Sequence, residues 1–211
     1  MANKLLAALV VGGAALLSVN TAQATVFTGT YSVSAFTDTD GTGLDIVTQN
    51  IAPQPFNLDL TQGVPQTIDL FKIWTTECCV NFDDFSPQSI SVTFNFTAPP
   101  PPFGGSVDGT TVAGTIILAS GGSVSWNDPI FVPYGVLNDG LLMIELSNEI
   151  FNVGLGGSFT PGEEHGAIVK ATFKVKKEAT VVVAEVPEPA TLALFGIGLL
   201  GLGVARRRFS S

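Results

Sequence analysis

The chain has 211 residues, of which 45% are hydrophobic and 13% charged, with 23 glycines and 13 prolines. This length allows one ordinary domain plus appendages, and the apolar content excludes a disordered chain. Between residues 25 and 180, five lysines stand against sixteen acidic residues, a net charge of −11 that excludes nucleic acid as an attractive partner.

The first 24 residues have the three-part layout of a secretory signal peptide. Lys4 precedes an uncharged, mainly apolar run over residues 5–17, and a polar stretch closes on small residues at Ala22 and Ala24, where signal peptidase requires them. The run is too short for a membrane span of about 20 residues. We therefore expect residues 1–24 to be a signal peptide that directs export, with the mature chain beginning at Thr25.

Residues 25–180 show the two-residue periodicity of β strands. In residues 88–97 apolar side chains alternate with Ser, Thr and Asn, and in residues 167–177 they alternate with lysines, which would suit an edge strand. Further strands are expected at residues 26–36, 56–60, 67–74, 111–118 and 141–146.

The segments between these strands are rich in turn-forming residues. They include "TDTDGTG", "APPPPFGG", "ASGGS" and "SNEIFNVGLGG", and no helical period or internal repeat interrupts them. We therefore predict an all-β exported domain over residues 25–180, folded as an antiparallel β-sandwich. Its topology, jelly-roll or immunoglobulin-like, stays open.

An acidic turn near residue 40 is the sharpest candidate for a cation site. Asp38, Asp40 and Asp45 are closely spaced around two glycines, and calcium is bound by clustered carboxylate and carbonyl oxygens. The segment departs from an EF-hand loop, because Thr42 and Gln49 occupy two ligand positions and no helices flank it. The alternative is an acidic hairpin turn between two strands. We therefore expect no cofactor, with calcium at this turn as the one candidate.

Cys78 and Cys79 are the only cysteines, and they are adjacent. They either pack as small apolar residues at a strand end or react, as a vicinal disulfide, an intermolecular bridge or a metal-binding thiol pair. A bond between neighbours needs a strained local turn. Neither outcome closes a large loop, so cysteines do not hold this fold together.

The inventory of catalytic side chains is thin. His165 is the single histidine and lies in a turn, which excludes a zinc site built on several histidines. Acidic pairs at residues 83–84 and 163–164 are expected to be solvated loop charges, and no spacing selects a pair for glycoside hydrolysis. Tyr31, Trp74, Trp126 and Tyr134 are expected in the core or at interfaces. We therefore expect no enzymatic activity.

The C-terminal segment combines a rigid linker, an apolar run and a basic end. A linker at 181–189 precedes sixteen uncharged residues at 190–205, which as a helix reach about 24 Å. Arg206, Arg207 and Arg208 follow at once, where arginines remain on the cytoplasmic side of a span. We expect a transmembrane helix at 190–205 and a cytoplasmic tail at 206–211, with the β domain outside.

Within this segment stands the hexapeptide Val186-Pro187-Glu188-Pro189-Ala190-Thr191, whose two prolines impose an extended backbone. Together with the Gly/Leu-rich run and the arginine cluster, it resembles the PEP-CTERM sorting signal of Gram-negative bacteria. The resemblance covers about 25 residues. It implies processing by an exosortase, a membrane enzyme that cuts near the motif, and delivery to the cell surface or extracellular matrix.

The resemblance also implies a setting rich in exopolysaccharide, as in a biofilm or floc. Our leading hypothesis is a non-catalytic matrix or surface protein that binds exopolysaccharide or copies of itself. The alternative is a secreted polysaccharide-modifying hydrolase that uses paired carboxylates. Signal peptidase and an exosortase are the expected processing partners.

Overall fold

The computed structural model of the chain describes residues 24–35, 43–116 and 119–182. These residues form β strands and three short 3-10 helices, without an α-helix, which confirms the all-β prediction. Within the same residues no helix is long and apolar enough to cross a membrane. The predicted signal peptide at 1–24, apart from Ala24, and the predicted span at 190–205 lie outside the described residues.

One sheet has six antiparallel strands in the order β10-β7-β6-β5-β1-β3. The strands are β1 (Thr25–Ala35), β3 (Phe56–Leu60), β5 (Gln88–Ala98), β6 (Phe103–Ile116), β7 (Ala119–Trp126) and β10 (Glu149–Phe151). Within it, β5, β6 and β7 follow one another as a meander, and β1 pairs with both β5 and β3.

The second sheet has five antiparallel strands in the order β2-β4-β11-β9-β8. The strands are β2 (Val47–Asn50), β4 (Gln66–Trp74), β8 (Ile130–Tyr134), β9 (Gly140–Leu146) and β11 (Ala167–Lys177). The last strand, β11, lies between β4 and β9. The expectation that its lysines mark an edge strand is therefore wrong: they lie on the outer face of a central strand.

Inward-facing side chains of both sheets form one hydrophobic core. Alternation in β1, β5 and β11 buries every second residue because successive side chains of a strand point to opposite faces. At its centre Phe173 of β11 meets Phe56 and Phe94 of the six-stranded sheet, each with ring centroids 5.7 Å apart. Buried aromatic rings therefore join the two sheets.

Several expected turns are strands. The stretch "APPPPFGG" ends inside β6, "ASGGS" begins β7, and β10 lies within "SNEIFNVGLGG". Close packing explains the glycines: a Cβ at Gly122 would stand 2.3 Å from the Phe151 ring, and one at Gly109 would stand 2.7 Å from Trp126. Glycine is needed here for close approach rather than for a turn.

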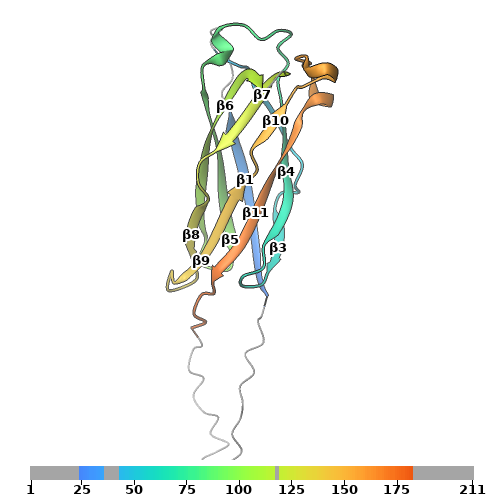
Figure 1. The fold of residues 1–211 in the computed structure, drawn as a ribbon. Helices are drawn as coiled ribbons and strands as arrows, with labels where there is room; N and C mark the ends of the chain where they lie inside the picture. The colour runs from blue at the N-terminus through green and yellow to red at the C-terminus, as the bar shows by residue number, and fades with distance from the viewer. Residues whose placement is uncertain (1–23, 36–42, 117–118, 183–211) are drawn as a thin grey trace, which may run out of the picture.

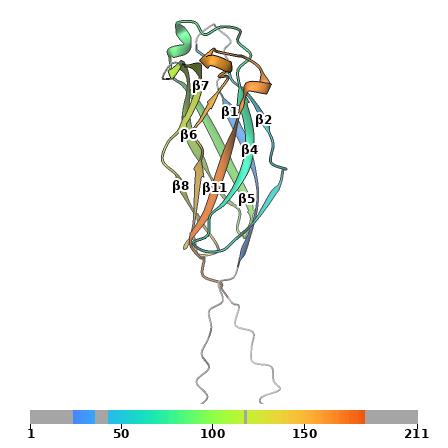
Figure 2. The ribbon, with the colours of Figure 1, turned by 45° about the vertical axis from the view of Figure 1, so that its right-hand side comes forward.

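The two ends of the molecule differ. β1 begins and β11 ends at the same end, whereas the 3-10 helices η1 (Asp83–Phe85), η2 (Leu155–Gly157) and η3 (Glu163–His165) gather at the opposite end (Figures 1 and 2). We call this opposite end the tip; it comprises the three 3-10 helices and the loop at 75–82. After β11 the chain therefore leaves the domain at the end opposite to the tip.

Candidate functional site: a polar sheet face and the tip

The outer face of the six-stranded sheet carries rows of hydroxyl and amide side chains. Strand register aligns them across β1, β5, β6 and β7, and all of them alternate with buried core residues. The aligned sets are Ser32–Thr93–Ser106, Ser34–Ser91–Asp108, Thr30–Asn95–Gly104 and Ser89–Thr110–Ser125. We call these four sets the polar face.

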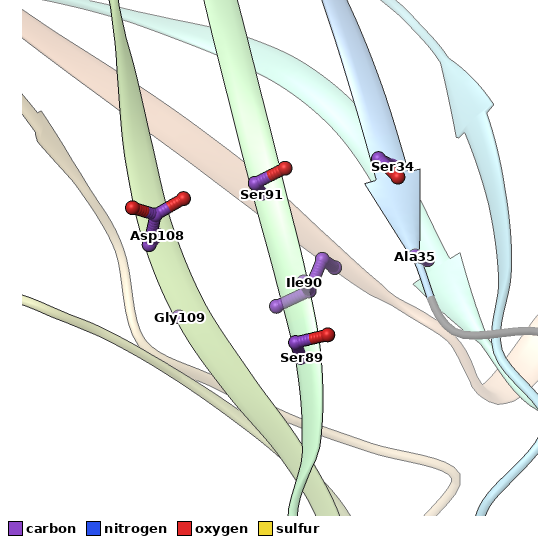
Figure 3. A pocket seen from close by; sticks show the side chains of 7 residues that line it. All are labelled: Ser34, Ala35, Ser89, Ile90, Ser91, Asp108 and Gly109. Atoms are coloured by element: carbon purple, nitrogen blue, oxygen red, sulfur yellow. The ribbon is translucent and has the colours of Figure 1, made fainter.

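A shallow hollow lies on the polar face near the end of β1. It has a volume of about 310 Å³ and is lined by Ser34, Ala35, Ser89, Ile90, Ser91, Asp108 and Gly109. In Figure 3, Ser34, Ser91 and Asp108 lie in one line across three neighbouring strands. The adjacent row along the strands, also part of the lining, is Ala35, Ile90 and Gly109.

The polar face is almost free of charge. Asp108 is the single ionisable side chain in its four rows, and neighbouring hydroxyls satisfy one another, as where Thr93 Oγ1 and Ser106 Oγ lie 2.8 Å apart. The outer side of the five-stranded sheet instead carries Lys170 and Lys174, on a strand that alternates with the core. The two outer surfaces therefore offer different chemistry to a ligand.

At the tip, Asn152 connects three segments of chain and is fully buried. Its Oδ1 accepts a hydrogen bond from the backbone N–H of Thr75 at 2.8 Å. Its Nδ2 donates to the carbonyl oxygens of Thr160 and Gly162, at 2.8 and 3.0 Å. The residue has φ 58°, a left-handed conformation that Asn tolerates. Asn152 thus fixes the loop after β10 against the end of β4.

Two carboxyl groups contact each other beside this loop. Asp84 is fully buried; its Oδ2 accepts from the Asn81 N–H at 2.7 Å, while its Oδ1 receives no hydrogen bond among the described residues. The Glu77 carboxyl lies against Asp84 and accepts the Asp45 N–H at 2.6 Å. Burial, and then the neighbouring carboxylates of Asp84 and Asp45, raise the pKa of Glu77. A protonated Glu77 can donate to the buried Asp84.

The exposed thiols of Cys78 and Cys79 follow Glu77 directly. Their Sγ atoms lie 3.0 Å apart. Because both residues are exposed, the expectation that they pack as small apolar residues at a strand end is wrong. The contact with Cys78 raises the pKa of the Cys79 thiol. Both sulfurs are free and open to reagents.

The predicted cation site is only partly described. Asp38 and Asp40 lie outside the described residues, and the backbone N–H of Asp45 is bound by Glu77. Within 24–35, 43–116 and 119–182, no group of three or more His, Cys, Asp or Glu side chains is arranged to hold a metal ion. Calcium binding through Asp38, Asp40 and Asp45 stays a prediction.

Of the other acidic residues, Asp84 contradicts the expectation of a solvated loop charge, because it is fully buried. Glu163 lies at the surface, where it meets the Lys72 ammonium at 3.5 Å. His165 lies in η3, and its carbonyl oxygen accepts from the Asn152 N–H at 2.7 Å. Neither the histidine nor the acidic pairs form a nucleophile–base arrangement with a described neighbour.

Two of the four tyrosine and tryptophan residues belong to the core. Tyr31 and Tyr134 are 4% and 1% exposed, and the Tyr31 hydroxyl donates to the Leu70 carbonyl oxygen. Trp126 packs edge-on against Phe71, and its Nε1 donates to the Ser147 carbonyl oxygen at 3.0 Å. Burial is the main cause of the raised pKa of Tyr134. The core expectation is thus confirmed for the two tyrosines.

Sequence reasoning missed Glu77, Asn152 and the hollow. A signal for the polar face was present, since "TYSVSA" and "QSISVTFNFT" both alternate hydroxyls with apolar residues. No local signal marks Asn152, because its hydrogen-bond partner Thr75 is 77 positions away. Glu77 likewise depends on Asp45 and Asp84, which the fold brings to it.

The predicted processing residues lie outside the described residues, so comparison with known proteins is the source of evidence for them. No curated protein and no solved structure matches the chain. The family model of the PEP-CTERM protein-sorting motif matches residues 185–208, which include the hexapeptide 186–191 and the arginines at 206–208. The predicted resemblance is confirmed: this chain carries a C-terminal PEP-CTERM protein-sorting motif, the signal of an exported exosortase substrate.

Proposed function

We propose that this protein is a non-catalytic component of the cell surface or extracellular matrix, and that its polar face binds exopolysaccharide. In this proposal the apolar segment 190–205 anchors the precursor in the membrane with the β-sandwich outside. An exosortase then cuts near the motif and passes the domain on. The sorting motif supports export and processing, and the polar face supports the binding role.

The observation that carries the binding role is the chemistry of the polar face. A polysaccharide presents many neutral hydroxyls, which hydroxyl and amide side chains can both donate to and accept from. The four rows present such groups on adjacent strands, with one carboxylate at Asp108. Strands in one sheet lie about 4.8 Å apart, so aligned rows can contact successive groups of an extended chain.

A matched pair of double variants tests the proposal. Thr93 and Ser91 lie on the polar face, whereas Thr67 and Thr172 form a hydroxyl pair at 2.8 Å on the other sheet, like the pair of Thr93 with Ser106. Ser91→Ala with Thr93→Val should weaken retention on the host's own polysaccharide about tenfold, at about 1 kcal/mol or less for each hydrogen bond lost.

Thr67→Val with Thr172→Val is the control and should leave retention unchanged. The protein is used in the form recovered from its host, with calcium and with a chelator, because the calcium prediction is tested in the same assay. Equal loss in both double variants would contradict a specific role of the polar face. Absence of retention in the unaltered protein would contradict polysaccharide binding altogether.

The sorting part has its own measurement, the intact mass of the protein from cell and matrix fractions of its host. Processing predicts a form that begins at Thr25 and lacks the span that follows Pro189. A membrane-bound form that still ends at Ser211 would instead mean a permanent anchor. This result does not depend on whether the domain binds polysaccharide.

The second candidate is a polysaccharide-modifying hydrolase, favoured by the raised pKa of Glu77, since a general acid needs such a shift. It ranks second because hydrolytic carboxyl groups are about 5 to 9.5 Å apart across the bond they cleave, whereas Glu77 and Asp84 contact each other. Turnover of host polysaccharide that disappears in Asp84→Asn would favour this candidate. If the pure protein does not hydrolyse host polysaccharide, this candidate is eliminated.

A further inference from the structure

We propose that Cys78 and Cys79 are a redox modification site, in which a vicinal disulfide forms and is readily reduced again. The site lies at the tip, in the loop at 75–82, at the end of the domain opposite to the C-terminal side of β11 (Figure 1). It is separate from the polar face, so this inference does not depend on the proposed binding function.

The geometry brings the two sulfurs together before any bond exists. The Sγ atoms are 3.0 Å apart, and a disulfide requires about 2.05 Å, so closure needs a movement of about 1 Å. Both side chains are exposed, which leaves the pair accessible to an oxidant. The flanking Glu77 and Val80 are half-buried, and Val80 packs against the hydrophobic core. The movement therefore falls on the two exposed cysteine side chains.

Ring closure between neighbours is nevertheless strained. Adjacent Cα atoms are about 3.8 Å apart, whereas bridged cysteines usually have Cα atoms 4.4 to 6.8 Å apart. Strained and exposed disulfides have higher reduction potentials and are the labile ones. Because the chain is an exported exosortase substrate, its thiols meet an oxidising environment in which such a bond forms.

The reaction is thiol–disulfide exchange with a small-molecule or protein disulfide. The thiolate of one cysteine attacks a sulfur of the oxidant, forms a mixed disulfide and releases one thiol. The thiolate of the second cysteine then attacks the Sγ atom of its neighbour, closes the ring and releases the oxidant's remaining sulfur as a thiolate. Two cysteine protons pass to the two leaving thiolates, so the pair loses two electrons and the oxidant gains them.

The test uses the full-length chain in glutathione mixtures that range from fully reduced to fully oxidised. Samples are quenched with acid, denatured, treated with N-ethylmaleimide and analysed by intact mass. We expect two maleimide additions at the reduced end. At the oxidised end we expect a monomer that has lost two hydrogens and takes up no maleimide. The midpoint of the change from the reduced to the oxidised form should lie inside the range of mixtures.

Cys79→Ser provides the matched control, because it keeps one exposed thiol and cannot close a ring. It should take up one glutathione at the oxidised end. Two maleimide additions in every mixture, glutathione on both cysteines, or disulfide-linked dimers on non-reducing gels would each overturn the intramolecular ring. If the disulfide stays closed even in the most reducing mixture, the proposal that it is readily reduced is wrong.

Discussion

The polar face and the tip both gather polar side chains, but they do so by different physics. On the polar face, exposed side chains such as Asn95 project from strands whose other side is the core. At the tip, Asn152, Asp84 and Thr75 are fully buried. The face therefore follows from strand periodicity. The tip is held by buried hydrogen bonds, one of which joins Thr75 to Asn152 across 77 positions.

This difference separates groups that are available for binding from groups that are needed for stability. A buried polar group without a partner costs about 1 to 3 kcal/mol, whereas an exposed one is satisfied by water. Substitutions that leave buried groups at the tip without a partner should therefore destabilise the domain, and those on the polar face should alter binding alone. Three predictions test this contrast.

The largest effect is expected for Asn152→Ala. It leaves the Thr75 N–H and the carbonyl oxygens of Thr160 and Gly162 without their partner. The Thr75 N–H is buried and the two carbonyl groups are half-buried, which predicts a loss of about 3 kcal/mol in the free energy of unfolding, measured by urea denaturation.

Two further variants separate the causes. Asn152→Gly loses the same hydrogen bonds but tolerates φ 58°, so it should be less destabilised than Asn152→Ala by about 1 kcal/mol. Asn95→Ala, on the polar face, should change stability by less than about 0.5 kcal/mol. Equal costs at residues 95 and 152 would contradict the contrast between face and tip.

A smaller effect, dependent on pH, is expected for Glu77→Gln. The pKa of Glu77 is raised above 4.5 in the folded chain, chiefly by burial and then by Asp84 and Asp45. The folded state therefore binds this proton more tightly than the unfolded state. Proton binding by Glu77 therefore stabilises the folded state fully below pH 4.5. This stabilisation is lost as the pH rises through the raised pKa of the folded state.

Gln at position 77 keeps an acceptor for the Asp45 N–H and supplies a permanent donor for the Asp84 carboxyl group. Glu77→Gln should therefore remove the fall in stability above pH 4.5 that this carboxyl causes, as measured by urea midpoints across pH. Asp84→Asn, which removes the facing charge, should reduce the same pH dependence. An unchanged pH profile in both variants would show that the two carboxyls are not coupled.

The sequence predicted those parts of the fold that depend on neighbours in the chain. Alternation in residues 88–97 and 167–177 identified β5 and β11 and their buried faces. The strand β7 escaped prediction because Gly121 and Gly122 are turn formers by composition, yet they are strand residues packed against Val153 and Phe151. Local pattern cannot distinguish a glycine needed for a turn from one needed for close packing.

The same limit explains the candidate sites. The hydroxyl side of β5 was readable from its alternation, but its alignment with Ser34 and Asp108 depends on strand register. Asp84 was expected in water as one of two adjacent acidic residues, and it is buried in η1, which packs against β6. Register and burial both arise from contacts distant in sequence, which composition does not encode.

The smallest effect on stability is expected for Thr93→Val. Valine keeps the β-branched shape that suits a strand and removes only the hydroxyl that pairs with Ser106 Oγ at 2.8 Å. Because Thr93 faces outward beside hydroxyls that water can reach, the free energy of unfolding should change by less than about 0.5 kcal/mol. Retention on host polysaccharide should fall while the urea midpoint stays constant. A lowered midpoint would mean that the polar face contributes to folding as the tip does, and reduced retention would then no longer report on binding.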